Sequence, residues 1–138
     1  MPATLIDAGP LTALLNPNDE WHAWARETVQ QLALPLLTSE PVLTEALYLL
    51  RRDGCDADEL FALAGHGVIK VGISFEDEQT PLRELMTRYR NIPMSLADAT
   101  LVRLSELHPD GRVFTLDADF HIYRRHGNKV IPVLMPDE

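Results

Sequence analysis

The sequence predicts an α/β fold with a mainly parallel sheet and helices on both of its faces. Short apolar runs alternate with amphipathic stretches along the chain, which is typical of strand–helix–strand units. Glycine, proline, asparagine and aspartate separate these stretches and predict turns between them. The 138 residues suffice for one hydrophobic core. No internal repeat or linker divides the chain, so we expect residues 1–138 to form a single domain.

Five short apolar runs predict the strands. Pro35 suits the start of the second strand, where its missing N–H disturbs no ladder. The stretch from His108 to Gly111 predicts a turn before the fourth strand. The predicted strands cover residues 3–6, 34–38, 68–71, 112–115 and 129–134.

Seven stretches with helical spacing of apolar residues predict the helices. Ser39 and Ser95 are typical N-cap residues. Asn18 or Asp19 is expected to cap the second helix, and Asp56 is expected to begin the fourth. The third helix lies between Ser39 and Gly54, and the others cover residues 10–15, 20–32, 57–64, 76–90, 95–107 and 119–126.

The charge and cysteine content restrict the class of protein. The formal net charge of −9 argues against a protein that coats nucleic acid by general electrostatics, although an enzyme that binds cations can still act on a polyanion. Cys55 is the single cysteine, which favours a reducing, cytoplasmic setting. The chain has no apolar run long enough to span a membrane and no signal-peptide pattern at its start, so we expect no membrane association.

Four acidic residues from separate segments are expected at one edge of the sheet. Asp7 and Asp117 each follow a predicted strand. Asp98 opens a helix, and Glu45 lies early in another. Because helices in such a sheet begin at the edge where the parallel strands end, these four carboxylates are predicted to converge.

Each of these acids also has a simpler explanation. Asp7 and Asp117 are suited to cap a helix, and Asp98 fits a capping box with Ser95. Glu45 alone is an ordinary helix glutamate. Four converging carboxylates repel one another unless cations bind them, and oxygen-only ligands favour Mg²⁺ or Mn²⁺.

Two further residues belong to the same stretch as Asp117. Thr115 lies two positions earlier, so its side chain points to the same face, where its hydroxyl can orient a ligand or satisfy a turn. Asp119 lies one helical step beyond and is expected to support the site rather than form it.

Four short motifs together resemble the PIN-domain family, and within it the VapC-like toxins of bacterial toxin–antitoxin pairs. They run from Leu5 to Ala8, from Thr44 to Leu47, from Ser95 to Ala99 and from Phe114 to Phe120, and so extend across nearly the whole chain. The resemblance implies a three-layer α/β/α sandwich and metal-dependent cleavage of RNA. It also implies a protein antitoxin as partner and a homodimer.

The resemblance assigns the acidic cluster to Asp7, Glu45, Asp98 and Asp117, with Thr115 and Asp119 in support. The cluster would hold Mg²⁺, or Mn²⁺, against the scissile phosphate, and the ion would lower the pKa of an attacking water. Where the family often has serine or threonine after the first aspartate, this chain has Ala8, with Thr12 further on.

Several cations are candidates for contacts with phosphate, although each is also explained as an ordinary surface residue. They are Arg51, Arg52, Lys70, Arg124 and Arg125, with His121 and His126 as weaker candidates.

Three other functions remain open on the sequence. The first is a catalytically weak PIN module that acts mainly by binding an antitoxin or RNA, for which Trp21 and Trp24 offer a surface if they do not belong to the core. The second is a phosphoacceptor signalling domain, which is disfavoured because Asp7 has no acidic neighbour and the strand at 68–71 ends without an aspartate. The third is a DNA nuclease, since the same acids can cut DNA.

Overall fold

The computed structural model describes residues 2–137 and contains a five-stranded parallel sheet. The strand order is β3-β2-β1-β4-β7. At the centre of the sheet, Leu5 of β1 lies opposite Leu37 on one side and Val113 on the other. The strands are β1 (Thr4–Ile6), β2 (Leu36–Thr38), β3 (Ile69–Val71), β4 (Arg112–Phe114) and β7 (Val133–Leu134). The predicted mainly parallel sheet is confirmed.

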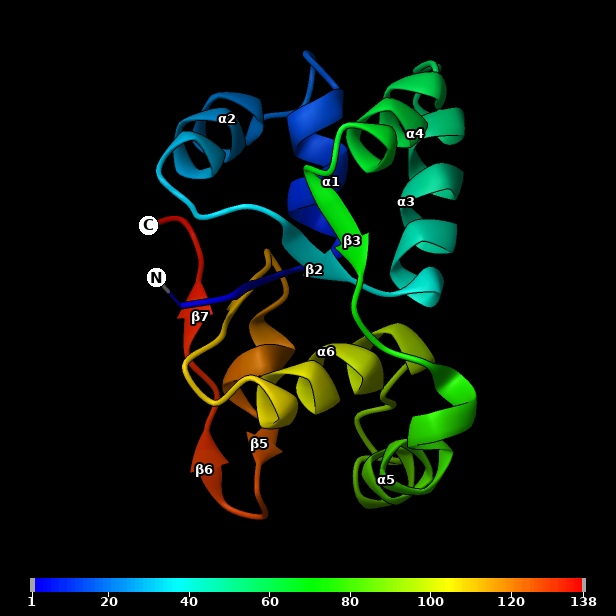
Figure 1. Cartoon of the computed structure of the whole chain (residues 1–138), viewed down its shortest axis with the longest axis vertical. Helices are drawn as coiled ribbons and strands as arrows, with labels where there is room; N and C mark the ends of the chain where they lie inside the picture. Colours follow the sequence, from blue (N-terminus) through cyan, green and yellow to red (C-terminus); the bar gives the residue numbers. More distant parts are fainter. Residues whose placement is uncertain (1, 138) are drawn as a thin grey trace.

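Helices cover both faces of this sheet, as Figure 1 shows. α1 packs against α2 and α3 on one face, and α5 packs against α6 on the other. The helices are α1 (Ala8–Leu15), α2 (His22–Gln30), α3 (Glu40–Arg52), α4 (Asp58–Gly65), α5 (Phe75–Arg88) and α6 (Leu96–Leu107). The three-layer α/β/α arrangement is therefore confirmed.

The C-terminal part of the chain differs from the prediction. The helix expected at residues 119–126 is a single 3₁₀ turn, η1 (Ala118–His121), followed by a strand. The strand expected at residues 129–134 is two separate strands. β5 (Arg124–Arg125) pairs antiparallel with β6 (Lys129–Val130), and only β7 joins the main sheet.

Long-range hydrogen bonds explain this hairpin. Arg125 donates from its guanidinium to the carbonyl oxygens of Ser105 (2.9 Å) and Pro109 (2.6 Å), and these bonds connect β5 to the end of α6. The turn between the strands places His126 and Gly127 at positive φ values of 50° and 88°. A helix over residues 119–126 would lose both the hydrogen bonds of Arg125 and the turn at His126 and Gly127.

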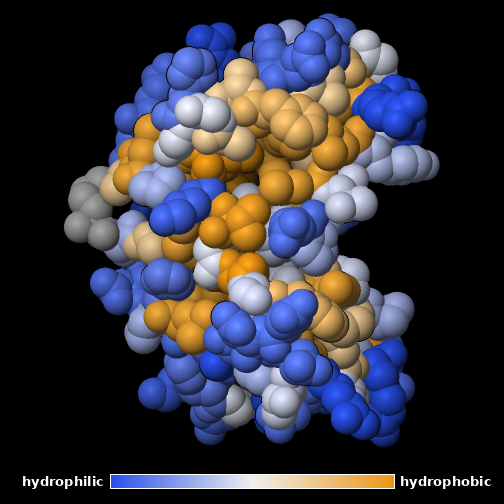
Figure 2. Space-filling view, turned by 45° about the vertical axis from the view of Figure 1, so that its right-hand side comes forward, coloured by the Kyte–Doolittle hydropathy of each residue, from blue (hydrophilic) through white to orange (hydrophobic). Residues whose placement is uncertain are grey.

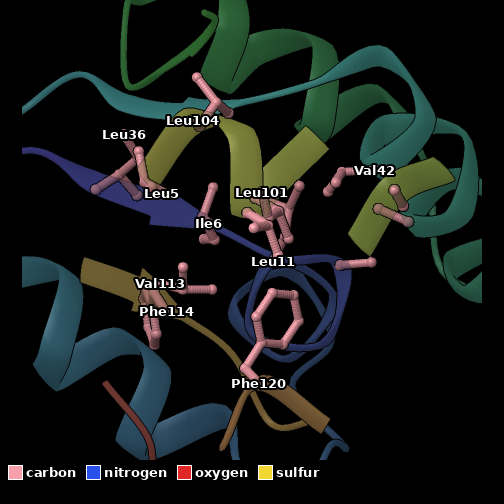
Figure 3. Close-up of a cluster of buried hydrophobic side chains, with 14 of the residues drawn as sticks. Leu5, Ile6, Leu11, Leu36, Val42, Leu101, Leu104, Val113, Phe114 and Phe120 are labelled. Atoms are coloured by element: carbon pink, nitrogen blue, oxygen red, sulfur yellow. The ribbon is translucent and has the colours of Figure 1, made fainter. Parts of the chain in front are cut away.

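The core lies on both sides of the central strands. Figure 3 shows side chains of β1, β4, α1 and α6 gathered round them. Phe114 is fully buried and packs edge-on against Trp24, with ring centroids 5.1 Å apart. Trp21 and Trp24 are half-buried and pack against this core, so the core explanation of the two tryptophans is confirmed.

The edge where the parallel strands end is built by helix caps. Asp7 caps α1 and accepts a hydrogen bond from the N–H of Ala8, while Ser39 caps α3 and accepts from the N–H of Val42. Ser95 and Asp98 form the predicted capping box of α6. The hydroxyls of Ser39 and Thr100 lie 2.7 Å apart and hydrogen-bond, joining the starts of α3 and α6 across the sheet edge.

Two predicted caps are wrong. Trp21 occupies the N-cap position of α2 without a side-chain bond, because Asp19 accepts from the N–H of Trp21 and so closes the preceding turn. α4 begins at Asp58, one residue later than expected, with Ala57 at its N-cap, and Asp56 accepts a hydrogen bond from the N–H of Asp58. In the described part of the chain, no helix combines the length and apolar character needed to cross a membrane.

Candidate active site

The sheet reverses its direction of growth between β1 and β4. From β1 the chain proceeds to β2 and β3 on one side, and then returns to place β4 on the other. Ligands of open α/β sheets bind in the crevice outside the strand ends at such a switch point. Asp7 follows β1, and Thr115 and Asp117 follow β4, so these residues lie at this point.

Thr115 connects the two strand ends. Its hydroxyl donates a hydrogen bond of 2.7 Å to Oδ2 of Asp7 and accepts one of 3.0 Å from the N–H of Asp117. Thr115 is fully buried and Asp7 is 7% exposed. The hydroxyl beside Asp7 therefore comes from the far end of the sequence, and the structure records no hydrogen bond between Thr12 and Asp7.

Asp117 begins the 3₁₀ turn. Its Oδ1 accepts a hydrogen bond of 2.9 Å from the N–H of Asp119, so the predicted capping role is present. The carboxylate of Asp117 also faces Glu45 and Asp98 closely enough to raise the pKa of each. Capping and membership of the acidic group are thus compatible.

Asp98 is held by hydrogen bonds from two segments. Its Oδ2 accepts from the hydroxyl of Tyr123 at 3.0 Å and from the N–H of Ser95 at 3.4 Å. Burial and the neighbouring carboxylates keep the pKa of the Tyr123 hydroxyl well above its ordinary value, so this hydroxyl remains a proton donor. Tyr123 is itself fully buried and packs edge-on against Tyr89 and Phe120.

The four predicted acids, here called the carboxylate cluster, act on one another electrostatically. The pKa of Asp7 is raised to about 6, and burial is the largest cause. The hydrogen bonds from Thr115 and Ala8 lower this pKa, whereas the charges of Asp98 and Glu45 raise it. Partial burial, Asp98 and Asp117 raise the pKa of Glu45. The four acids, which come from four separate segments, therefore lie close enough for their carboxylates to repel one another, as the predicted convergence requires.

The donor chemistry of the cluster fits a hard divalent cation. It offers carboxylate oxygens only. Burial first, and then the neighbouring carboxylates, raise the pKa values of Asp7, Glu45 and Asp98, and a bound cation would offset both costs of the negative charge. Among residues 2–137, no three acidic, histidine or cysteine side chains are oriented to share one ion. For these carboxylates to bind one ion together, at least one side chain must rotate. Glu45 is the simplest candidate, because it is exposed, whereas Asp7 and Asp98 are fixed by hydrogen bonds.

Tyr123 is the residue of the site that the sequence analysis missed. Its contact with Asp98 links residues 25 positions apart, and neither residue belongs to a motif containing the other. An aromatic residue directly after the Asp117 stretch was visible, but periodicity gives no indication that its hydroxyl reaches α6.

Two of the proposed phosphate-binding cations use their guanidinium groups within the fold. Arg124 donates to the carbonyl oxygens of residues 121–123, and Arg125 binds the end of α6. His126 contributes its backbone N–H to Glu106. Lys70 is exposed on β3, and Arg51 and Arg52 are exposed at the end of α3. Arg51 and Arg52 follow Glu45 on the same helix and line a hollow together with Thr44 and Tyr48.

Comparisons with known proteins agree with this architecture. A family model described as PIN domain matches residues 4–125. Among solved structures, the chain resembles the crystal structure of Mycobacterium tuberculosis VapC20, described as a sarcin–ricin loop cleaving toxin. The two are 24% identical with a TM-score of 0.72, and the match covers 85% of this chain and 92% of that chain. No curated protein sequence matches the chain. Because the family match covers residues 4–125, which include four of the five strands of the main sheet and the whole carboxylate cluster, this chain belongs to the PIN domain family.

Proposed function

We propose that this protein is a divalent-metal-dependent endoribonuclease and that it acts as the toxin of a toxin–antitoxin pair. The observation that carries the proposal is the carboxylate cluster, whose members come from four segments; burial and the neighbouring carboxylates raise the pKa values of Asp7, Glu45 and Asp98. Membership of the PIN domain family and the fold shared with the VapC20 toxin support it.

Asp7, Asp98 and Asp117 would hold Mg²⁺ or Mn²⁺ with Glu45 completing the shell, and the ion would neutralise the scissile phosphate and acidify a water. The protein fixes two of these ligands in advance. Thr115 and the N–H of Ala8 orient both oxygens of Asp7, and Tyr123 orients Asp98. Such outer hydrogen bonds set the direction of ligand lone pairs.

Glu45 would complete the shell of the ion or help to accept the proton of the attacking water. Its side chain is exposed, and a pKa above the ordinary value makes its carboxylate a better base near neutral pH. In the proposed reaction the water oxygen forms a bond to phosphorus and its proton passes to the Glu45 carboxylate. The bond from phosphorus to the 3′ oxygen breaks and the leaving oxygen takes up a proton from solvent, which gives a 5′-phosphate and a 3′-hydroxyl.

The biological setting extends this proposal. We expect a protein antitoxin encoded beside this chain, a homodimer, a cytoplasmic location and a single domain over residues 1–138. A short neighbouring reading frame that encodes a DNA-binding protein, together with rescue of growth on its co-expression, is the observation that tests the toxin role.

Removal of divalent metal is expected to abolish RNA cleavage by the purified protein. Without a cation, the negative carboxylates of the cluster repel the negative phosphate group of the RNA that must bind beside them. Activity should return with Mg²⁺ or Mn²⁺, measured by gel electrophoresis of end-labelled RNA, with DNA of the same sequence as a control. A substrate containing the sarcin–ricin loop belongs among the RNAs tested. Metal binding by calorimetry without cleavage of any RNA would instead favour the binding module.

Replacing Tyr123 by phenylalanine is expected to lower kcat/KM about 10- to 100-fold, the usual cost of losing an outer hydrogen bond to a metal ligand. The ring and its packing remain, and only the bond to Asp98 is lost. The apparent metal affinity should fall with the activity, measured by titration with Mn²⁺.

Tyr89→Phe is the matched control. The Tyr89 hydroxyl accepts a hydrogen bond from the N–H of Arg124, so this variant also loses one bond without touching a carboxylate. Each variant should lose about 1 kcal/mol of stability. Equal activity of the Tyr123 and Tyr89 variants would show that Tyr123 has only a structural role.

A further inference from the structure

An open groove passes the carboxylate cluster on the side of Glu45. Its middle section, of about 840 Å³, lies between the starts of α3, α5 and α6 and is lined by Glu45, Tyr48, Phe75 and Ser95 among others. Figure 2 shows the hollow in this face, between the upper part that contains α3 and α4 and the lower part that contains α5.

This middle section continues into a hollow at each end. Along α3 it shares Thr44 and Tyr48 with a hollow of about 650 Å³ that ends at Arg51 and Arg52. Along α5 it shares Phe75 and Leu96 with a hollow of about 510 Å³. The second hollow is lined by Arg83 and Arg90. We call the three sections together the aromatic groove.

The charges of the aromatic groove are arranged for a polyanion that crosses the cluster. Four of the chain's 12 lysines and arginines lie in its two ends, in a protein of net charge −9. Arg52 forms an ion pair with Asp53 at 3.0 Å, whereas within residues 2–137 no ion pair is recorded for Arg51 or Arg83. Glu40 and Glu45 make the middle section acidic, which suits a cation-bearing centre between two phosphate-binding ends.

Two aromatic side chains stand exposed in the same groove. Tyr48 is 66% exposed and Phe75 is 59% exposed, on helices that face each other across the middle section. Exposed aromatic rings in a groove with phosphate-binding cations are the usual platform for unpaired bases, which stack on them with little dependence on sequence. A paired duplex offers no free base faces to such rings.

We propose that the aromatic groove binds single-stranded RNA across the active site, with bases stacked on Tyr48 and Phe75 and flanking phosphates at Arg51 and Arg83. This inference rests on the proposed ribonuclease function, because it places the strand so that one phosphate passes Glu45. It assigns base stacking to Tyr48 and Phe75, and it assigns the two ends of the bound segment to α3 and α5.

The test measures the affinity of a fluorescent single-stranded RNA by anisotropy. The full-length chain carries Asp117→Asn throughout, so that the RNA remains intact, and electrophoresis checks that it does. Tyr48→Ala and Phe75→Ala should each weaken binding about tenfold, the effect of losing one stacked base. Arg51→Ala and Arg83→Ala should each reduce the slope of log affinity against log salt by about 0.7.

Matched controls lie outside the groove. Phe61 on α4 is 65% exposed, nearly the same as Tyr48, and Arg26 on α2 is an exposed arginine, so Phe61→Ala and Arg26→Ala should leave affinity and salt slope unchanged. Equal losses in groove and control variants would overturn the proposal. Tighter binding of duplex RNA than of single-stranded RNA would also overturn it. A change of oligomeric state in Tyr48→Ala with unaltered RNA affinity would overturn it as well, and would identify the groove as a contact between copies of the chain.

Failure of this inference is distinguishable from failure of the proposed function. Cleavage by the otherwise unmodified chain is measured separately with Mg²⁺ and Mn²⁺. If that chain cuts RNA and Tyr48→Ala and Phe75→Ala cut it with unchanged KM, the RNA path is wrong and the ribonuclease stands. If the unmodified chain cuts no RNA with either ion, the ribonuclease proposal fails.

Discussion

Asp7→Asn is expected to abolish RNA cleavage and at the same time to stabilise the metal-free protein. The carboxylate of Asp7 is buried beside two other acids, and its pKa of about 6 shows that the folded protein disfavours its charge. Asparagine keeps an oxygen for the N–H of Ala8 and caps a helix as well as aspartate does. The substitution therefore removes repulsion while the local structure remains.

The size of the effect follows from the pKa. The difference between about 6 in the folded protein and the ordinary 3.8 corresponds to about 3 kcal/mol. Asparagine at position 7 must also rearrange its bond with Thr115, so a gain of about 1–3 kcal/mol at pH 7 is expected, or roughly 3–10 °C in Tm for a chain of this size. Cleavage should fall more than about 100-fold, beyond the cost of an outer-shell change, because a proposed metal ligand is lost.

The stabilisation has a defined pH window. Between the unfolded pKa near 4 and the folded pKa of about 6, the folded protein keeps a proton that the unfolded chain has released. The stability that Asp7 contributes is therefore present below pH 4 and is lost as the pH rises to about 6. The Tm of Asp7→Asn should match the original protein near pH 4 and exceed it from pH 6 upward.

Calorimetry in a chelator over pH 4–8 measures this difference. Asp56→Asn is the control, because Asp56 is an exposed aspartate that also accepts a backbone N–H. A lower Tm for Asp7→Asn than for the original protein at pH 7 would show that the charge of Asp7 is stabilised in the folded state. Excess Mg²⁺ should reverse the order of the two Tm values, since only the original protein gains from the bound cation.

The fold was predictable where local sequence determines it. Ser39 and Ser95 indicate helix starts by chemistry that acts within three residues, and the structure contains both caps. Short apolar runs bounded by turn residues predict buried parallel strands for the same reason. The order of the strands depends on which strand pairs with β1, and pairings such as Leu5 with Val113 join residues more than a hundred positions apart.

The C-terminal hairpin shows the limit of local patterns. Residues 119–126 have acceptable helical spacing, but Arg125 binds carbonyl oxygens at the end of α6, and this bond replaces the helix with a strand. A local signal was present, since a three-residue loop that contains Gly127 between two short stretches is typical of a hairpin. Tertiary hydrogen bonds outweighed a weak helical preference over eight residues.

The sequence predicted which acids form the candidate site, but it did not predict the hydrogen bonds that orient them. Strand ends and helix starts share one edge, so Asp7, Asp98 and Asp117 were expected together. Thr115 was expected in support, but its bond to Asp7 was not, because it joins residues 108 positions apart, and Tyr123, which reaches Asp98 across 25 positions, was not expected at all. Such bonds need the folded sheet before they can be recognised.

Asp117→Asn is expected to abolish cleavage, whereas Asp119→Asn should keep most of it. Both residues follow β4, and the structure gives them different surroundings. The carboxylate of Asp117 raises the pKa of Glu45 and of Asp98, so it faces the carboxylate cluster. Asp119 contributes its N–H to Oδ1 of Asp117, and its charge acts on the Tyr123 hydroxyl rather than on the cluster.

The comparison separates charge from structure, because asparagine at position 117 still accepts the N–H of Asp119 through its side-chain oxygen. Both variants should therefore fold with a Tm close to that of the original protein. For Asp117→Asn, kcat/KM on a labelled RNA should fall more than about 100-fold, while for Asp119→Asn the fall should stay below about tenfold. Retention of a tenth of the activity by Asp117→Asn, or a larger loss in Asp119→Asn, would move the catalytic charge away from the end of β4. The expected result would instead place it on Asp117, the carboxylate that faces both Glu45 and Asp98.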